Sequence, residues 1–233
     1  MKLSTAAYSD QGPVREINAD AVLADAARGF FAVADGVGSQ PESAQASRFA
    51  VDKALEVYRS LGGRLDNAVR PGELFAGVKE AYDSAFGLHP PATTLTVGYF
   101  AGTRFHFFNV GDSPVLLLSG GARLLTREHT IVDRLVPIVD FSAMKSILGS
   151  NVLFNYLGEP DAFAPAYDPV EIVGPTRLLL CSDGVFDFLS QEDLGILHAR
   201  APSPADFVRL VQAAAGAAVP TDNYSLVVVD AEP

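Results

Sequence analysis

Hydrophobic residues recur along the chain with two spacings, one typical of strands and one typical of helices. Short apolar runs bounded by turn residues indicate buried strands, and the clearest of them ends at Asp35-Gly36. Apolar residues three or four positions apart indicate amphipathic helices. Strands are predicted within 1–12 and at 21–24, 30–34, 93–100, 104–110, 115–118, 123–126, 170–173, 176–181 and 224–229. Helices are predicted from Pro41 to the glycines at 62–63, over 71–86, after Ser190-Gln-Glu-Asp193, and over 204–218.

The order of these elements predicts an α+β fold of packed layers. Strands, two helices, many strands, and then helices with one last strand do not form the alternating pattern of a βαβ protein. Residues 127–160 have no clear spacing, and Pro137 interrupts their apolar positions, so one or two short helices are expected there. No repeat or linker is visible, and a single domain over 1–233 is therefore predicted.

Composition and charge narrow the classes of function. Hydrophobic residues make up 48% of the chain and charged residues 19%, which is enough for a sizeable core. A formal net charge of -11 argues against binding to nucleic acids or to anionic membranes. Cys181 is the one cysteine, and its apolar neighbours predict a buried thiol. With no disulfide framework, no signal-peptide pattern and no apolar run of about 20 residues, the expected location is the cytoplasm.

Acidic residues stand where several of the predicted strands end. One Asp-Gly pair alone is better explained as turn chemistry. The repetition of an acid at several strand ends favours a metal site instead. Carboxylate oxygens suit hard cations such as Mg²⁺ or Mn²⁺. Zinc is less suitable, because the four histidines have no paired ligand spacing and there is one thiol. The acids at strand ends are Asp35, Asp112, Asp183 and Asp222, and Asp20 opens a further strand.

Six motifs in sequence order resemble the PPM family, the type 2C metal-dependent protein serine/threonine phosphatases, in its bacterial form. The resemblance extends from about Arg15 to Val229. It implies a four-layer α-β-β-α sandwich, in which two central antiparallel sheets hold metals between them at one edge. The motifs are Arg15 with Asn18 and Asp20, Val33-Ala-Asp-Gly-Val-Gly38, Val110-Gly-Asp-Ser113, Leu125-Thr126 with His129-Thr130, Cys181-Ser-Asp-Gly184 with Asp187, and Asp222-Asn-Tyr-Ser225.

The resemblance implies a centre of two Mn²⁺ or Mg²⁺ ions. Asp35 would bridge both ions and act in catalysis, and Asp183 and Asp222 would complete the first ion. The backbone carbonyl of Gly36 would contact the second. Two cations about 3.5–4 Å apart clamp an in-line displacement and lower the pKa of the attacking water, so no covalent phosphoenzyme is required.

Four further residues receive roles from the same resemblance. Asp20 would hold a metal-bound water, and Arg15, five residues earlier, would bind the substrate phosphate with its planar guanidinium. Asp112 and Asp187 match the acids that hold a third, weaker ion. The expected substrates are proteins phosphorylated on serine or threonine by a partner kinase, and the enzyme is expected to be a monomer.

Departures from the family pattern leave alternatives open. Ala19 stands where the family often has Glu or Gln, and Pro114 where it has Arg. Ala19, which removes a possible metal-binding carboxylate, and Pro114 together suggest a pseudophosphatase that binds phosphoproteins without turnover. A hydrolase of small phosphate esters is a third hypothesis. Glu128 stands where Asp is common, and the next residue, His129, is either a general acid or an orienting residue. Residues 131–158 correspond to the family's flap.

Overall fold

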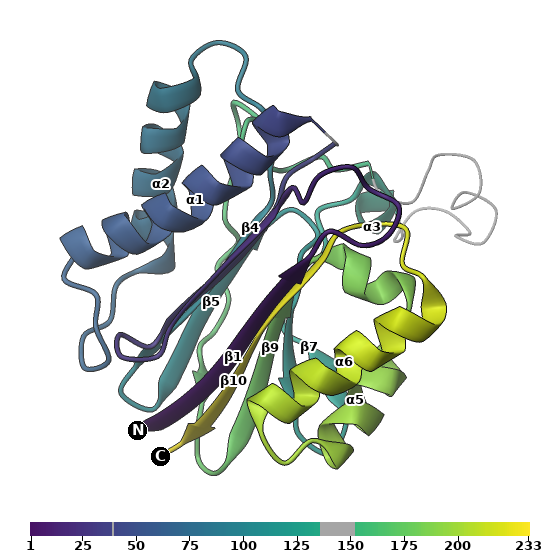
Figure 1. Ribbon diagram of the computed structural model, residues 1–233. Coiled ribbons are helices and arrows are strands. Elements are labelled where there is room, and N and C mark those ends of the chain that lie inside the picture. The colour runs from purple at the N-terminus through teal and green to yellow at the C-terminus, as the bar shows by residue number, and fades with distance from the viewer. Residues whose placement is uncertain (39, 136–151) are drawn as a thin grey trace.

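The strands form two antiparallel sheets in the computed structural model, which describes residues 1–38, 40–135 and 152–233 (Figure 1). The first sheet has the order β1 (Lys2–Asp10), β10 (Tyr224–Glu232), β9 (Thr176–Cys181), β6 (Val115–Leu118) and β7 (Ala122–Leu124). The second has the order β2 (Asp20–Asp25), β3 (Phe30–Asp35), β4 (Leu95–Ala101), β5 (Arg104–Val110) and β8 (Val170–Glu171). The two ends of the chain lie side by side because β1 pairs with β10 over its whole length.

The two sheets pack face to face, which explains the continuous apolar runs in their central strands. In β3, Phe31 and Val33 point into the layer between the sheets, whereas Phe30 and Ala32 point toward the helices. The side chains of strand β10 alternate between the two faces in the same way, and Val227 points into the layer between the sheets. A strand buried on both faces reads as a continuous apolar run, and for this reason 30–34 gave a clear signal.

Helices cover the outer face of each sheet and complete four layers, as the family resemblance implied (Figure 1). The predicted capping box is confirmed, since the Ser190 hydroxyl accepts from the Asp193 amide at 3.1 Å and the Asp193 carboxylate accepts from the Ser190 amide at 2.9 Å. Helices α1 (Pro41–Ser60) and α2 (Pro71–Phe86) pack on the second sheet, and α5 (Gln191–Arg200) and α6 (Pro204–Ala218) on the first. The remaining helical segments of the described chain are α3 (Ile131–Leu135) and η1 (Asp183–Asp187).

The structure differs from the predicted elements in one strand, and most of one predicted segment lies outside the described residues. Strand β8 covers two residues, and the prediction of a strand over 170–173 was too long because the exposed Val173 pairs with no strand. Most of the predicted flap, residues 136–151, lies outside the described residues. The described part of that segment returns to the core through an isolated bridge between Thr93 and Leu157.

Within the described ranges, no helix has the length and hydrophobicity needed to cross a membrane.

A buried ion pair fixes the end of the first sheet that lies away from the β9–β10 acids. Arg177 is 5% exposed and holds both oxygens of Asp230 at 2.5 and 2.8 Å, and it also donates to the carbonyl of Ala201 at 2.9 Å. The guanidinium thus joins β9, β10 and the segment between α5 and α6.

Replacing Asp230 with alanine should lower the free energy of unfolding by about 3 kcal/mol, because Arg177 would keep a buried charge without its partner. Urea denaturation of wild type and variant measures the loss. The control is Glu232→Gln, whose partner Lys2 forms an exposed pair that contributes about 0–1 kcal/mol. Equal losses in the two variants would contradict the account of Arg177.

Candidate metal centre

The pairing of β2 with β3 places two carboxylates directly opposite each other. Asp20 and Asp35 are register partners at the end of this hairpin. Like charges in directly opposed positions destabilise a strand pair unless something neutralises them. The backbone of Asp35 is held firmly, since its amide donates to the Thr94 hydroxyl at 2.9 Å and its carbonyl accepts from the Thr94 amide at 2.8 Å.

The opposite sheet brings further acids to the same edge. Asp183 begins η1 two residues after β9 ends, and Asp222 lies two residues before β10. The carboxyl groups of Asp35 and Asp183 lie close enough for each to shift the pKa of the other, so the acids of the two sheets meet at this point. Asp112 lies where the chain crosses from β5 to β6, and its charge acts on Asp35 as well. The structure therefore brings together the acids that the sequence placed at strand ends.

Burial and mutual repulsion raise the pKa values of these carboxyl groups. Burial is the largest cause throughout, and it brings the pKa of Asp20 to about 7 and that of Asp112 to about 8. For Asp20, the nearby hydroxyls of Ser225 and Ser182 lower the pKa in part, while the charges of Asp183 and Asp222 raise it. Burial likewise raises the pKa values of Asp35 and Asp183. Such a group of acids favours any partner that supplies positive charge.

The donor set fits hard divalent cations. Asp20 accepts a hydrogen bond from the Ser182 hydroxyl at 2.7 Å through Oδ2, whereas its buried Oδ1 has no donor within hydrogen-bonding geometry. No three His, Cys, Asp or Glu side chains among the described residues are arranged as ready ligands of one ion. These acids fit divalent cations through their chemistry, because clustered carboxylate oxygens are the ligands that Mg²⁺ and Mn²⁺ prefer.

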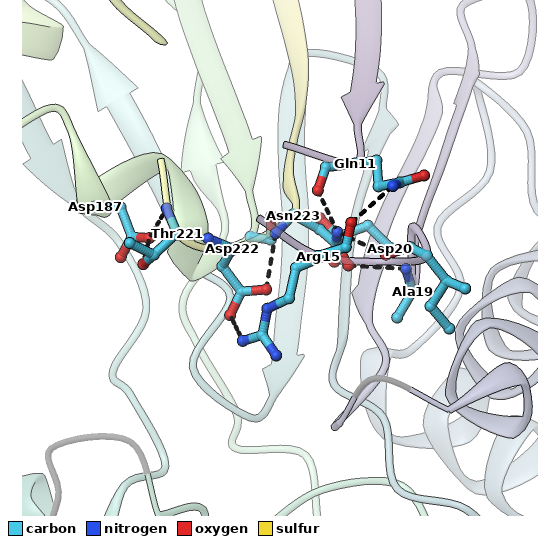
Figure 2. A network of polar contacts seen from close by, with 10 residues as sticks. Gln11, Arg15, Ala19, Asp20, Asp187, Thr221, Asp222 and Asn223 are labelled. Carbon is cyan, nitrogen blue, oxygen red and sulfur yellow. Dashed lines mark hydrogen bonds and ion pairs between the residues drawn. The ribbon is translucent and has the colours of Figure 1, made fainter. Parts of the chain in front are cut away.

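Arg15 is the cation that the structure places among these acids. Its Nη2 lies 2.5 Å from Oδ2 of Asp222, and both side chains are about one-third exposed (Figure 2). The guanidinium is therefore aimed by Asp222 while remaining open to solvent. A phosphate group approaching this edge would meet a planar donor fork that suits its oxygens.

Asn223 positions the loop that carries Arg15, a role that the sequence did not reveal. Its Oδ1 accepts from the Ala19 amide at 2.9 Å, and its Nδ2 donates to the carbonyls of Gln11 and Ile17 at 2.7 and 2.9 Å (Figure 2). These bonds fix both ends of the loop before β2. Its position next to Asp222 in a quoted motif was the one available signal.

Asp187 clamps the segment that carries Asp222. Its Oδ2 accepts three hydrogen bonds, from the amide and hydroxyl of Thr221 at 3.1 and 2.6 Å and from the Asp222 amide at 3.2 Å (Figure 2). The charge of Asp187 also raises the pKa of Asp183. The role of Asp187 toward a third ion stays a prediction, and its visible role is to position Asp222.

Gly36 is required by close packing. A Cβ atom at this position would lie 2.2 Å from the carbonyl oxygen of Ser43 and 2.8 Å from that of Ala19. The end of β3 is thus pressed against the first turn of α1, where any side chain would displace backbone atoms. The Gly36 amide donates to the Ala19 carbonyl at 3.1 Å, which keeps the two residues beside each other.

Comparison with known proteins assigns the chain to a family. Residues 14–220 match the family model described as "Protein phosphatase 2C". The chain belongs to the protein phosphatase 2C family. It is 33% identical over 239 residues to the serine/threonine protein phosphatase PstP of Mycobacterium tuberculosis (strain CDC 1551 / Oshkosh), and the match covers 98% of this chain. It covers 45% of that relative, so the chain spans about half of the relative's length.

Solved structures of the phosphatase 2C family share the fold. The crystal structure of Mycobacterium tuberculosis PstP/Ppp superposes with a TM-score of 0.84 at 28% identity, and it covers 99% of each chain. The catalytic domain of PstP in complex with two manganese ions gives a TM-score of 0.80 at 28% identity, covering 98% of this chain and 97% of the other. The family resemblance and the layered α+β fold inferred from sequence are therefore confirmed.

Ala19 is the departure from the phosphatase 2C pattern that lies nearest to these acids. Its side chain is buried, and its carbonyl accepts from the Ser47 hydroxyl at 2.5 Å as well as from the Gly36 amide. The backbone at this position is therefore fixed by Asn223, Gly36 and Ser47, without a side-chain carboxylate. Ala19 holds the hairpin that carries Asp20 and Asp35, and it contributes no ligand atom of its own.

The metal-free protein should lose stability as the pH rises from 5 to 8. The carboxyls of Asp20 and Asp112, with pKa values of about 7 and 8, still bind protons that the unfolded chain has released above about pH 4. Their contribution is complete below that pH and is lost as the pH rises through the folded pKa values, by up to about 1.4 kcal/mol per pH unit for each group.

Urea denaturation in EDTA at several pH values measures this dependence. Asp112→Asn should show a shallower slope, because one of the titrating groups is removed. Added Mn²⁺ should stabilise the protein more at pH 8 than at pH 5, since it competes with protons for the same oxygens. Stability that is constant or rises across this range in EDTA would contradict the pKa assignments.

Proposed function

We propose that residues 1–233 form one domain that acts as a metal-dependent protein serine/threonine phosphatase. The observation that carries the proposal is the meeting of both sheets at one edge, where the carboxyl groups of Asp35 and Asp183 interact beside the Arg15–Asp222 pair. The printed name of the Mycobacterium tuberculosis relative, serine/threonine protein phosphatase, supports the same substrate class. The manganese-bound PstP structure supports metal dependence.

The acids of this edge would hold two divalent cations, with Mn²⁺ favoured by the PstP structure and Mg²⁺ as the other choice. Asp35 is the register partner of Asp20 and interacts with Asp183, so it would contact both ions, and Asp183 and Asp222 would complete the first. The carbonyl of Gly36 would serve the second. Bound there, the cations would activate water for in-line attack and neutralise charge on the phosphoryl oxygens.

Side chains of the protein would orient the attacking water and the phosphoryl group. Asp20, held by the Ser182 hydroxyl, would orient the attacking water through hydrogen bonding. Arg15 would bind the phosphoryl oxygens, with Asp222 holding one side of its guanidinium. Asp112 and Asp187 would hold a third, weaker ion. The substrate is a phosphorylated serine or threonine on a protein, supplied by a partner kinase, and the domain works as a cytoplasmic monomer.

Phosphate release from three substrates tests the proposal. A phosphothreonine peptide, p-nitrophenyl phosphate and small phosphorylated metabolites are assayed across Mn²⁺ and Mg²⁺ concentrations. The expected result is metal-dependent turnover of the peptide at least as efficient as that of the metabolites. Absence of turnover in folded protein at every metal concentration would overturn the proposal, and phosphopeptide binding without turnover would identify the pseudophosphatase suggested by Ala19. A strong preference for metabolites would identify a small-ester hydrolase.

A further inference from the structure

His129 lies in a buried cage beside the turn that carries Asp112. It is 4% exposed, and its ring packs against Phe154 and Phe163 with centroid distances of 5.8 and 5.6 Å. The ring nitrogen Nδ1 lies 3.1 Å from the amide of Gly111 and 2.8 Å from Nδ2 of Asn155. One nitrogen atom thus meets two polar groups from different segments.

The surroundings of Asn155 decide which of these groups donate. The Asn155 side chain pairs with the backbone of Phe163 at two points, accepting from its amide at 3.0 Å and donating to its carbonyl at 2.8 Å. This pairing allows one orientation of the amide, so Nδ2 is the group that faces His129. Both Nδ2 of Asn155 and the amide of Gly111 are donors, and Nδ1 of His129 must accept from them. A neutral ring then carries its proton on Nε2.

The same histidine holds Gly111 through both its amide and its carbonyl. Its side chain accepts from the Gly111 amide, and its own backbone amide donates to the Gly111 carbonyl at 3.1 Å. Asn109 adds a second donor to that carbonyl at 3.0 Å. Gly111 has a φ of +104°, a conformation that favours glycine and must be held by its neighbours. Asp112 is the next residue, so the position of its carboxylate depends on these bonds.

We propose that His129 is a positioning residue that holds the Asp112 turn and ties it to the segment from Asn155 to Phe163, rather than the general acid of the reaction. A histidine that acts as a general acid is charged, with protons on both Nδ1 and Nε2, so that giving the Nε2 proton to the leaving oxygen leaves a neutral ring. Protonation of Nδ1 would set a third N–H against the two donors of Gly111 and Asn155 and break both bonds. The inference rests on the proposed phosphatase function, because it assigns His129 to the support of Asp112 as a metal ligand.

Two variants of His129 separate the roles. Asparagine keeps an acceptor oxygen close to the place of Nδ1, whereas phenylalanine keeps the ring shape and removes the acceptor. For a positioning residue, His129→Phe should raise the Mn²⁺ concentration needed for half-maximal rate by about 10–100-fold, with equal loss on p-nitrophenyl phosphate and on the phosphothreonine peptide. His129→Asn should recover most of that loss.

A general acid predicts a different result. Protonation matters for the poor alkoxide leaving group of phosphothreonine and little for p-nitrophenolate, so both variants would lose activity on the peptide alone. That pattern would overturn the proposal. Calorimetric titration of Mn²⁺ into wild type and His129→Phe supplies a readout independent of turnover, and unchanged affinity in the phenylalanine variant would also overturn it.

Imidazole NMR of the wild-type protein tests the assignment without any substitution. Between pH 6 and 8, the nitrogen shifts of His129 should show a neutral ring with protonated Nε2 and an unprotonated acceptor at Nδ1. A charged ring, or a proton on Nδ1, would overturn the inference even if His129→Phe failed to fold. If the wild-type protein has no phosphatase activity, the proposed function fails, whereas the NMR and Mn²⁺ titrations still decide the role of His129.

Discussion

Replacing Asp35 with asparagine should reduce metal-dependent phosphate release by roughly 10³-fold or more, equivalent to about 4 kcal/mol of transition-state stabilisation. Asp35 links the acids of the two sheets, because it is the register partner of Asp20 and interacts electrostatically with Asp183. An amide keeps the size of the side chain but removes the negative charge that two cations would share. Steady-state rates on the phosphothreonine peptide at saturating Mn²⁺ measure the loss.

The same substitution should stabilise the metal-free protein at pH 8. Burial and neighbouring acids raise the pKa of Asp35, so its ionised form is disfavoured in the folded state. The matched control is Asp25→Asn, at the opposite end of the same strand pair, which should leave activity unchanged. Near-normal rates in Asp35→Asn would show that the site has been wrongly assigned.

Removing the guanidinium of Arg15 should lower kcat/KM by roughly 10²–10³-fold, the usual effect of losing one donor to a developing charge. Arg15→Lys should recover only part of this loss, because an ammonium group is a point charge and cannot present a planar fork. Rates at saturating Mn²⁺ separate this effect from any change in metal affinity caused by freeing Asp222.

Arg104→Ala is the control for Arg15, since its pair with Glu171 is exposed and belongs to the edge of the second sheet. It should behave as wild type. Full activity in Arg15→Lys would show that charge alone is needed. Wild-type activity in Arg15→Ala would show that Arg15 does not belong to the phosphate site.

The sequence predicted most elements because burial leaves a local pattern. Residues 30–34 are apolar throughout since one face meets the other sheet and the other meets helices. The Ser190 capping box likewise depends on residues three positions apart. Both signals lie within a few residues of the element that they specify, and periodicity is well suited to such signals.

The arrangement of the acids could be anticipated only through the family resemblance. Periodicity does not say that β5 and β6, separated by the short Asp112 turn, lie in different sheets. It also does not give the register that sets Asp20 opposite Asp35. Strand partners and register depend on contacts between distant segments, which leave no local trace.

Positioning residues were the hardest to predict. The bonds of Asn223 reach back about 200 positions to Gln11, Ile17 and Ala19, and the contact of Gly36 with Ser43 depends on where α1 packs. A buried asparagine and a glycine look ordinary in a sequence. Their roles depend on which backbone groups the folded chain places next to them.

Manganese content and phosphate release measured on one preparation test the central claim most directly. After removal of metal with EDTA, the protein should release no phosphate from the phosphothreonine peptide. Stepwise return of Mn²⁺ should fill two sites per chain, and the rate should rise with their occupancy. Turnover that persists in EDTA, or two filled sites without any release of phosphate, would contradict the account.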